Sequence, residues 1–194
     1  MKRNLLTIQF TENGLIILNK KKLIKYKLKS INNYFITNKE LFIEEISNII
    51  ETNKINNNLL TDNIKIIVDS TYSELYLSNL KEIFKELSFN KVDFINIIDI
   101  LPPSNNVIFI DVSNNSIKII HKDIVYQSNV NFSKYIQILS IYLKNIQKHH
   151  HIDNIYLYGT YPYTNRFIAE IEKICKIKTY IYSDSELIPI KLLI

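Results

Sequence analysis

The amino-acid sequence predicts an α/β protein that contains two tandem copies of one βββαβαβ unit, each with a mixed sheet. Three observations support this prediction: two meanders of short apolar strands, the same order of helices and strands after each meander, and a proline-containing break between the copies. The chain has 194 residues, of which 46% are hydrophobic and 22% are charged, as is typical of a globular protein. This length is sufficient for one or two domains with a sizeable core.

The first unit begins with a meander whose strands are short apolar runs at 5–10, 15–18 and 23–29. Apolar residues at helical spacing predict two helices, at 38–51 and 76–87. Apolar runs predict two further strands, at 64–68 and 92–98. Asn38 is expected to cap the first helix, and the polar stretch 53–58 is expected to form a surface loop.

The second unit repeats this order. Its meander has three predicted strands, at 107–110, 117–120 and 124–130. Two helices at 133–146 and 162–175 and two strands at 155–158 and 179–182 follow. Ser133 is expected to cap the first helix, and Pro162 suits the first turn of the second. Because Pro102 and Pro103 end regular structure, the predicted lobes are residues 1–103 and 104–194.

Two tandem units of this order, each a ribonuclease-H-like core, resemble the actin-like ATPase superfamily, which includes actin, the DnaK-type chaperones and the sugar kinases. The resemblance covers nearly the whole chain and is carried by the order of elements. Within the superfamily, the chain is most similar to pilus-assembly PilM and cell-division FtsA. Residues 66–89, for example, are similar to the strand and helix that precede the second half of those proteins.

The resemblance implies a vestigial nucleotide site in the second lobe. In the family, the second meander carries a phosphate-binding turn of the Asp-φ-Gly-x-Gly-Thr type, and residues 111–116 take its place here. A further family turn contacts the adenosine where this chain has Gly159 and Thr160. The candidate nucleotide-binding residues are accordingly Asp111, Ser113, Asn114, Ser116, Gly159 and Thr160.

The same positions depart from the family pattern. Phosphate-binding turns need glycine because the backbone must approach the oxygen atoms closely. Ser113 and Asn115 stand where the family has glycine, and in the first meander Gln9 and Thr11 stand where it has a metal-linked Asp and a Gly. We therefore expect a degenerate member without ATP hydrolysis or tight nucleotide binding, with no catalytic residues, no metal and no cofactor. ATP binding is the alternative.

Other chemical readings are weaker. Asp111 and Asp69 each end an apolar strand, and each is more simply a turn-forming aspartate that bonds nearby backbone. A nuclease of this fold needs several converging carboxylates, but Gln9 occupies the first-strand position. The consecutive histidines at 149–151 point in diverging directions on a helix and are expected to form a solvated helix end. Cys175 lies on an apolar helix stripe and is expected to be a core residue.

The third predicted strand of the first unit, at 23–29, is rich in lysine. Lys25, Lys27 and Lys29 share one strand face, which predicts an exposed edge strand protected from pairing. The alternative is a basic patch for an acidic partner or an anionic membrane surface. The formal net charge of +5 is too small and too diffuse to indicate nucleic-acid binding. The apolar tail 187–194 is expected to pack on the second lobe, with a partner or membrane contact as the alternative.

These expectations combine into a functional hypothesis. The resemblance implies a non-catalytic adaptor or scaffold of a membrane-associated assembly, PilM-like first and FtsA-like second, that grips a cytoplasmic peptide of a membrane protein. The alternatives are an active nucleotide-binding ATPase, or a pseudo-enzyme subunit that partners a catalytic homologue, similar to TsaB. A homo- or hetero-oligomer is compatible with each. The sequence shows no signal peptide and no membrane-length apolar window, so the expected location is the cytoplasm, with peripheral association at the inner membrane face.

Overall fold

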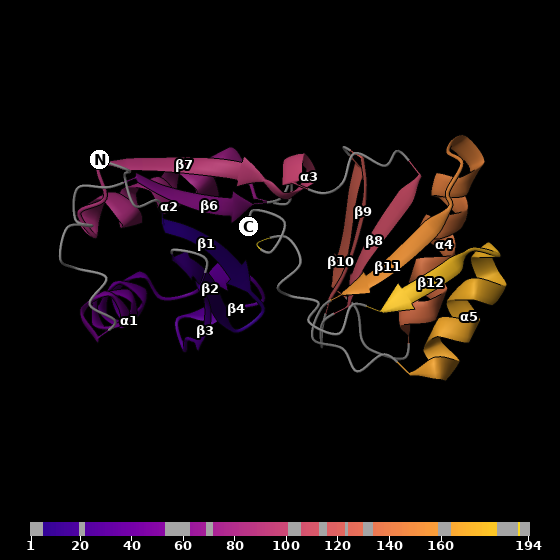
Figure 1. Ribbon diagram of the computed structural model, residues 1–194, viewed down its shortest axis with the longest axis horizontal. Helices are drawn as coiled ribbons and strands as arrows, with labels where there is room; N and C mark the ends of the chain where they lie inside the picture. The colour runs from indigo at the N-terminus through magenta and orange to yellow at the C-terminus, as the bar shows by residue number, and fades with distance from the viewer. Residues whose placement is uncertain are drawn as a thin grey trace. The chain divides into compact units, whose positions relative to one another are not determined.

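The computed structural model describes residues 6–19, 22–52, 63–68, 72–100, 106–112, 116–122, 124–129, 134–158, 164–181 and 190. The chain divides into two compact units. The first unit contains Met1–Ile100 and Pro189–Ile194, and the second contains Leu101–Ile188. Each unit has a five-stranded mixed sheet, and the predicted α/β class with two mixed-sheet lobes is confirmed (Figure 1).

The first unit has the sheet order β3-β2-β1-β6-β7. Its strands are β1 (Leu6–Thr11), β2 (Gly14–Asn19), β3 (Lys22–Lys27), β4 (Ile31–Asn32), β5 (Phe35–Ile36), β6 (Asn63–Val68) and β7 (Lys91–Asn96). Its helices are α1 (Lys39–Thr52), α2 (Glu74–Glu86) and α3 (Ile97–Ile100). Strands β1 to β3 form the predicted antiparallel meander, and β6 and β7 run parallel to β1.

The sequence pattern did not predict the β4–β5 hairpin. Its two central residues, Asn33 and Tyr34, have φ values of 52° and 72°, as a two-residue turn matched to the strand twist requires. Each strand contains only two residues, which is too short to produce a periodic signal. The hairpin packs against the start of α2, because Phe35 meets Tyr72 and Tyr76 at ring-centroid distances of 5.2 and 5.1 Å.

Gly14 starts β2 at the tightest point of the first meander. A Cβ added there would overlap the backbone carbonyl oxygen of Tyr26 on β3. One of the two glycines in the chain is thus required by the close approach of β2 and β3.

The second unit has the sheet order β10-β9-β8-β11-β12, which repeats the order of the first. Its strands are β8 (Val107–Val112), β9 (Ser116–His121), β10 (Ile124–Asn129), β11 (Asn154–Tyr158) and β12 (Lys178–Ile181). Its helices are α4 (Tyr135–His149) and α5 (Asn165–Cys175). The strands β8 to β10 are antiparallel, and β11 and β12 run parallel to β8.

The two meanders share one register. In the first, Gln9 on β1 lies opposite Ile16 on β2, which lies opposite Lys25 on β3. In the second, the row is Asp111 on β8, Lys118 on β9 and Gln127 on β10. The number of residues between Gln9 and Asp111 is the same as that between Ile16 and Lys118 and that between Lys25 and Gln127. Gln9 and Asp111 therefore occupy equivalent positions in two copies of one architecture.

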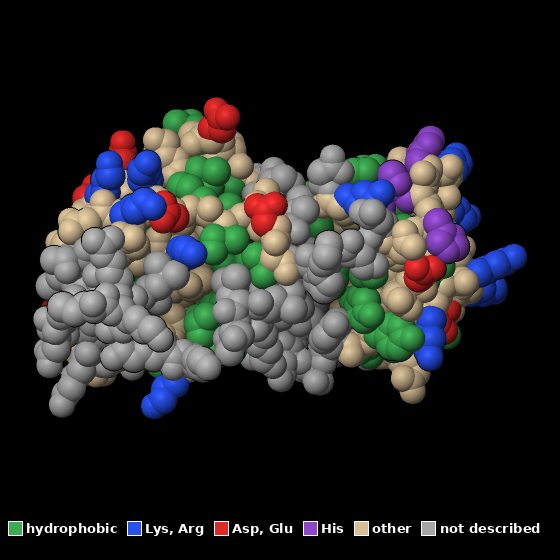
Figure 2. Space-filling view, turned by 45° about the horizontal axis from the view of Figure 1, so that its top comes forward, with side chains coloured by type: hydrophobic (Ala, Val, Ile, Leu, Met, Phe, Trp, Pro, Cys, Tyr) green, Lys and Arg blue, Asp and Glu red, His purple; other side chains and the backbone are tan. Residues whose placement is uncertain are grey.

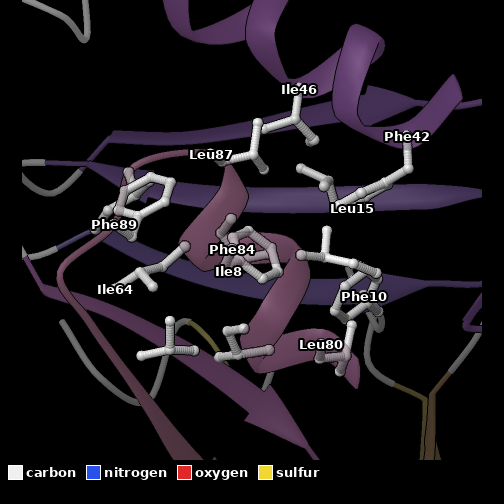
Figure 3. Packing of buried hydrophobic residues seen from close by; sticks show 14 of the residues in the cluster. Ile8, Phe10, Leu15, Phe42, Ile46, Ile64, Leu80, Phe84, Leu87 and Phe89 are labelled. Carbon is white, nitrogen blue, oxygen red and sulfur yellow. The ribbon is translucent and has the colours of Figure 1, made fainter. Parts of the chain in front are cut away.

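Each sheet is covered on one face by two helices. In the first unit, Leu6, Ile8 and Phe10 alternate along β1 and belong to a buried cluster with residues of α1 and α2. Figure 3 shows Phe42 and Ile46 of α1 and Leu80 and Phe84 of α2 directed toward this strand face. In the second unit, residues of α4 and α5 form the corresponding cluster with alternate residues of β8.

The helix starts were predicted only in part. Asn38 Oδ1 accepts the Leu41 N–H at 3.0 Å, so the predicted cap of α1 is confirmed. The prediction that α4 begins at residue 133 is wrong, because the helix begins at Tyr135 and Lys134 occupies the cap position without a side-chain hydrogen bond. The predicted start of α5 at residue 162 is also wrong, since the Thr164 hydroxyl accepts the Phe167 N–H at 3.2 Å and the helix begins after it. Ser133, Pro162 and the predicted loop 53–58 lie outside the described residues.

Candidate functional site

The strand β8 places Asp111 on the sheet face opposite the helices. Its neighbours Ile110 and Val112 belong to the helix-covered core, so Asp111 and Phe109 point to the other face. Asp111 is nevertheless buried, with 5% of its surface exposed. The carboxyl group is therefore held at the end of a rigid strand, as expected for this fold, but is shielded from water.

Lys118 lies directly opposite Asp111 on β9. Side chains of residues opposite each other in antiparallel strands have Cβ atoms about 4.5–5.5 Å apart. Lys118 is also only 5% exposed. The register therefore places a buried lysine beside a buried aspartate, while the Asp111 Oδ1 atom accepts no hydrogen bond from the residues that the structure describes.

Lys118 is not among the candidate site residues that the sequence pattern predicts. The available signal was a single lysine inside the otherwise apolar run Ile117–Ile120. Lys118 shares its strand face with Ile120, which is also buried. Without the register, however, nothing in the sequence pairs this lysine with Asp111. Strand pairing supplies that information, and it brings the two charges to the same row.

Only part of the predicted nucleotide site falls within the described residues. Asp111 and Ser116 lie on the same face of β8 and β9, and Ser116 is buried and pairs with Asn129 of β10. Ser113, Asn114, Gly159 and Thr160 lie outside the described residues, as does Asp69. Nucleotide binding by this set stays a prediction.

Gln9, at the position equivalent to Asp111, contacts a different part of the chain. Its side-chain Oε1 accepts the backbone N–H of Ile190 at 3.1 Å. Gln9 is 8% exposed and Ile190 is fully buried within the first unit. The prediction that the tail packs on the second lobe is therefore wrong for Ile190. Hydropathy predicts that an apolar tail is buried, but it does not say against which sheet.

The lysine-rich strand has the predicted arrangement. β3 is the edge strand of the first sheet, and Lys25, Lys27 and Lys29 are exposed. On the other face, Tyr26 packs against the core and Leu28 is buried. Figure 2 shows that charged side chains of both signs are spread over the visible face of the molecule.

The histidines at the end of α4 turn to different neighbours. His150 lies with its ring centroid 4.8 Å from that of His121, whose Nδ1 is 3.0 Å from the Val107 carbonyl oxygen. His151 Nε2 lies 2.9 Å from Asp153 Oδ1, and His149 is exposed. Within the part of the chain that the structure describes, no group of three or more His, Cys, Asp or Glu residues is placed to hold a metal ion.

Cys175 is a core residue, as predicted. It ends α5 and is buried in the helix-covered cluster of the second unit. Burial raises the pKa of its thiol to about 11, and the positive charge of Lys144 offsets part of the rise. A thiol with this pKa is a poor nucleophile at neutral pH.

Among the described helices, none is long and apolar enough to cross a bilayer.

Comparison with known proteins identifies the fold. No family model matches the sequence, and no curated protein sequence matches it. Solved structures do match over nearly the whole chain, and they define the class: this chain has the actin-like ATPase fold. The predicted superfamily resemblance is confirmed at the level of fold.

Three structures illustrate the likeness. MreB5 of Spiroplasma citri bound to ADP has a TM-score of 0.69 at 10% identity, covering 99% of this chain and 95% of that one. PilM in the PilM–PilN type IV pilus biogenesis complex has a TM-score of 0.66 at 6% identity, covering 97% and 90%. The cytoplasmic domain of EpsL, an inner membrane component of the type II secretion system of Vibrio cholerae, has a TM-score of 0.58 at 8% identity, covering 98% and 94%.

Proposed function

We propose that this chain is a non-catalytic adaptor with the actin-like fold, which binds a peptide of a partner protein in a membrane-associated assembly. A PilM-like role in pilus assembly is the first form of the proposal, and an FtsA-like scaffold is the second. The chain works by presenting a fixed protein surface, and nucleotide turnover plays no part in it.

The main support is the use of the two equivalent positions at which the superfamily resemblance places metal- and phosphate-facing groups. In the first unit that position is Gln9, a neutral side chain whose Oε1 accepts a hydrogen bond from Ile190. In the second it is Asp111, buried opposite Lys118. The first position therefore serves a contact within its own unit, and the second is buried in register with a lysine, which we take to disfavour a metal–phosphate site at both.

The similar structures supply the partner class. One was solved as a PilM–PilN complex and another belongs to an inner membrane component of a secretion system. By analogy, the partner of this chain is a membrane protein with a cytoplasmic segment. The test is a pull-down with the full chain as bait against the inner-membrane pilus proteins of the same cell. Recovery of one of them supports the proposal, and recovery of none contradicts the PilM-like form.

An active ATPase is the second candidate, because the second unit retains an aspartate at the end of β8 and MreB5 was solved with ADP. At a hundredfold excess over Kd, ATP-Mg²⁺ would stabilise the folded chain by about 2.7 kcal/mol. For a chain of this size, that corresponds to a rise in Tm of roughly 5–10 °C. We expect no such rise, and a rise that Asp111→Asn abolishes would establish nucleotide binding instead. Co-purification with a larger actin-like ATPase would indicate the pseudo-enzyme partner.

A further inference from the structure

A cavity of about 600 Å³ lies in the first unit, where the end of β3 meets the β4–β5 hairpin. Three parts of the chain line it: Asn13 in the β1–β2 turn, residues 27–29 at the end of β3, and Ile31, Asn32 and Thr37 around the hairpin. Lys27 and Lys29 are exposed, whereas Leu28 and Ile31 are buried. The lining therefore presents two amines together with amide and hydroxyl groups, while Leu28 and Ile31 belong to the buried core beneath it.

Hydrogen bonds hold the walls of this cavity in place. The Leu28 N–H donates to the Asn13 carbonyl at 3.0 Å, and the Thr37 N–H donates to the Ser30 carbonyl at 2.8 Å. The N–H groups of Lys29 and Ser30 donate to the Glu45 carboxylate at 2.9 and 3.2 Å. Because the β1–β2 turn, the end of β3 and α1 are tied together, a ligand would not have to order them, and that saves conformational entropy on binding.

The lining of the cavity carries positive charge, and two carboxylates, Glu45 on α1 and Glu12 in the β1–β2 turn, belong to the segments around it. None of the seven lining residues is acidic, and two are lysines. Glu45 is the nearby carboxylate that bears on Lys29. Desolvation acts to raise its pKa, but hydrogen bonds from Ser30 and Lys29 and the charge of Lys29 outweigh it, so that the pKa is lowered. The Glu45 carboxylate already accepts hydrogen bonds from backbone donors and from the Ser30 hydroxyl at 2.5 Å. Lys27 has no acidic neighbour among the residues that line the cavity.

We propose that this cavity binds an acidic segment of the partner peptide, with a carboxylate near the amines of Lys27 and Lys29. The inference rests on the proposed function, and it adds the chemistry of the partner. A preformed concave site with a few polar groups suits a peptide side chain. A bilayer surface would instead call for a flat or helical face with apolar residues that insert among the lipids.

The direct test measures binding of a short fluorescein-labelled peptide, in which glutamates flank a leucine, to the full chain by fluorescence anisotropy. Two matched peptides replace the glutamates by glutamines or by lysines. We expect the glutamate peptide to bind most tightly, and the variant Lys27→Glu/Lys29→Glu to weaken its binding by about tenfold or more. The control is Lys81→Glu, which reverses an exposed charge on α2 and leaves every lining residue in place.

Each outcome bears on the inference. Equal binding of the glutamate and glutamine peptides, or equal weakening by Lys81→Glu, would show that the cavity does not select a carboxylate. Binding to phosphatidylglycerol vesicles that depends on Lys27 and Lys29, without peptide binding, would assign the lysines to a membrane and overturn it. In the pull-down, a partner recovered equally by the wild-type chain and by Lys27→Glu/Lys29→Glu removes this inference alone. Failure of the wild-type chain to recover any partner contradicts the PilM-like form of the proposed function.

Discussion

The backbone N–H of Ile190 donates to the side-chain Oε1 of Gln9 at 3.1 Å, a contact within the first unit between residues 181 positions apart. Both residues are buried. A neutral amide suits this buried position better than a carboxylate, because burying a charge costs more than burying an amide that accepts a hydrogen bond. The identity of residue 9 is thus explained by the segment that returns to it.

Replacing Gln9 by Met keeps the length of the side chain and removes the acceptor. The Ile190 N–H is then buried without its partner, so the free energy of unfolding should fall by about 1–3 kcal/mol. Urea unfolding followed by circular dichroism measures the change. In a chain shortened to end at residue 188, Gln9→Met should lower the free energy of unfolding by less, because the Ile190 N–H donor is absent. An equal cost in both backgrounds would show that the hydrogen bond does not stabilise the fold.

The row formed by Asp111 and Lys118 predicts strong coupling between the two side chains. Asp111→Asn or Lys118→Met alone leaves one buried charge uncompensated and should cost about 3 kcal/mol or more. The double variant should cost clearly less than the sum of the two single variants. Urea unfolding of all three variants tests this.

An exposed ion pair provides the control for that cycle. Lys91 Nζ and Asp93 Oδ2 are 2.8 Å apart, with side chains 60% and 35% exposed. The same substitutions there should change the free energy of unfolding by no more than about 1 kcal/mol. If Asp111→Asn costs no more than Asp93→Asn, the charge of Asp111 is not compensated by Lys118.

Glu45 predicts a specific pH dependence. Its folded pKa is lowered, so its carboxylate contributes stability above the unfolded value of about 4.3 and loses that contribution as the pH falls through the folded value. Because much of the carboxylate is screened by solvent, Glu45→Gln should reduce the free energy of unfolding near pH 7 by no more than about 1 kcal/mol, and this effect should disappear as the pH falls through the lowered folded pKa. Urea unfolding at several pH values measures this. Glu44→Gln, an exposed neighbour on α1, should leave the curve almost unchanged.

Cys175 predicts slow thiol chemistry in the folded chain. With its pKa raised by burial to about 11, its thiolate fraction at pH 8 is about a hundredfold lower than that of a thiol with pKa 9.0. Reaction with a disulfide reagent should be slower by at least this factor, and should approach the rate of a free thiol in strong urea. A folded chain that reacts as fast as free cysteine would contradict the buried position.

The sequence predicted the repeated order of elements because the strands and helices of both units carry clear apolar patterns, as in the strand segments Ile64–Val68 and Ile155–Tyr158. It missed the β4–β5 hairpin, whose two-residue strands have no period to detect. It placed the start of α5 at Pro162, because proline suits the first turn of a helix, whereas the helix begins after Thr164, whose hydroxyl caps it.

The candidate site was less predictable, because it depends on pairings between distant residues. A strand pattern identifies Asp111 as a residue at the end of a strand, but only the register brings Lys118 to it. Likewise, nothing in the local sequence around Gln9 indicates that its partner is Ile190. The cavity at the end of β3 combines residues from a turn, a strand and an unpredicted hairpin, so it could not be inferred in advance.

The return of Ile190 to the first unit also bears on how the chain is synthesised. Domains generally fold in the order in which they leave the ribosome. Here the first sheet emerges early, but the N–H that satisfies Gln9 emerges only after every strand of the second sheet. The nascent protein therefore holds an unfinished first unit until the segment around Ile190 has been synthesised, and that interval is when a chaperone would bind it.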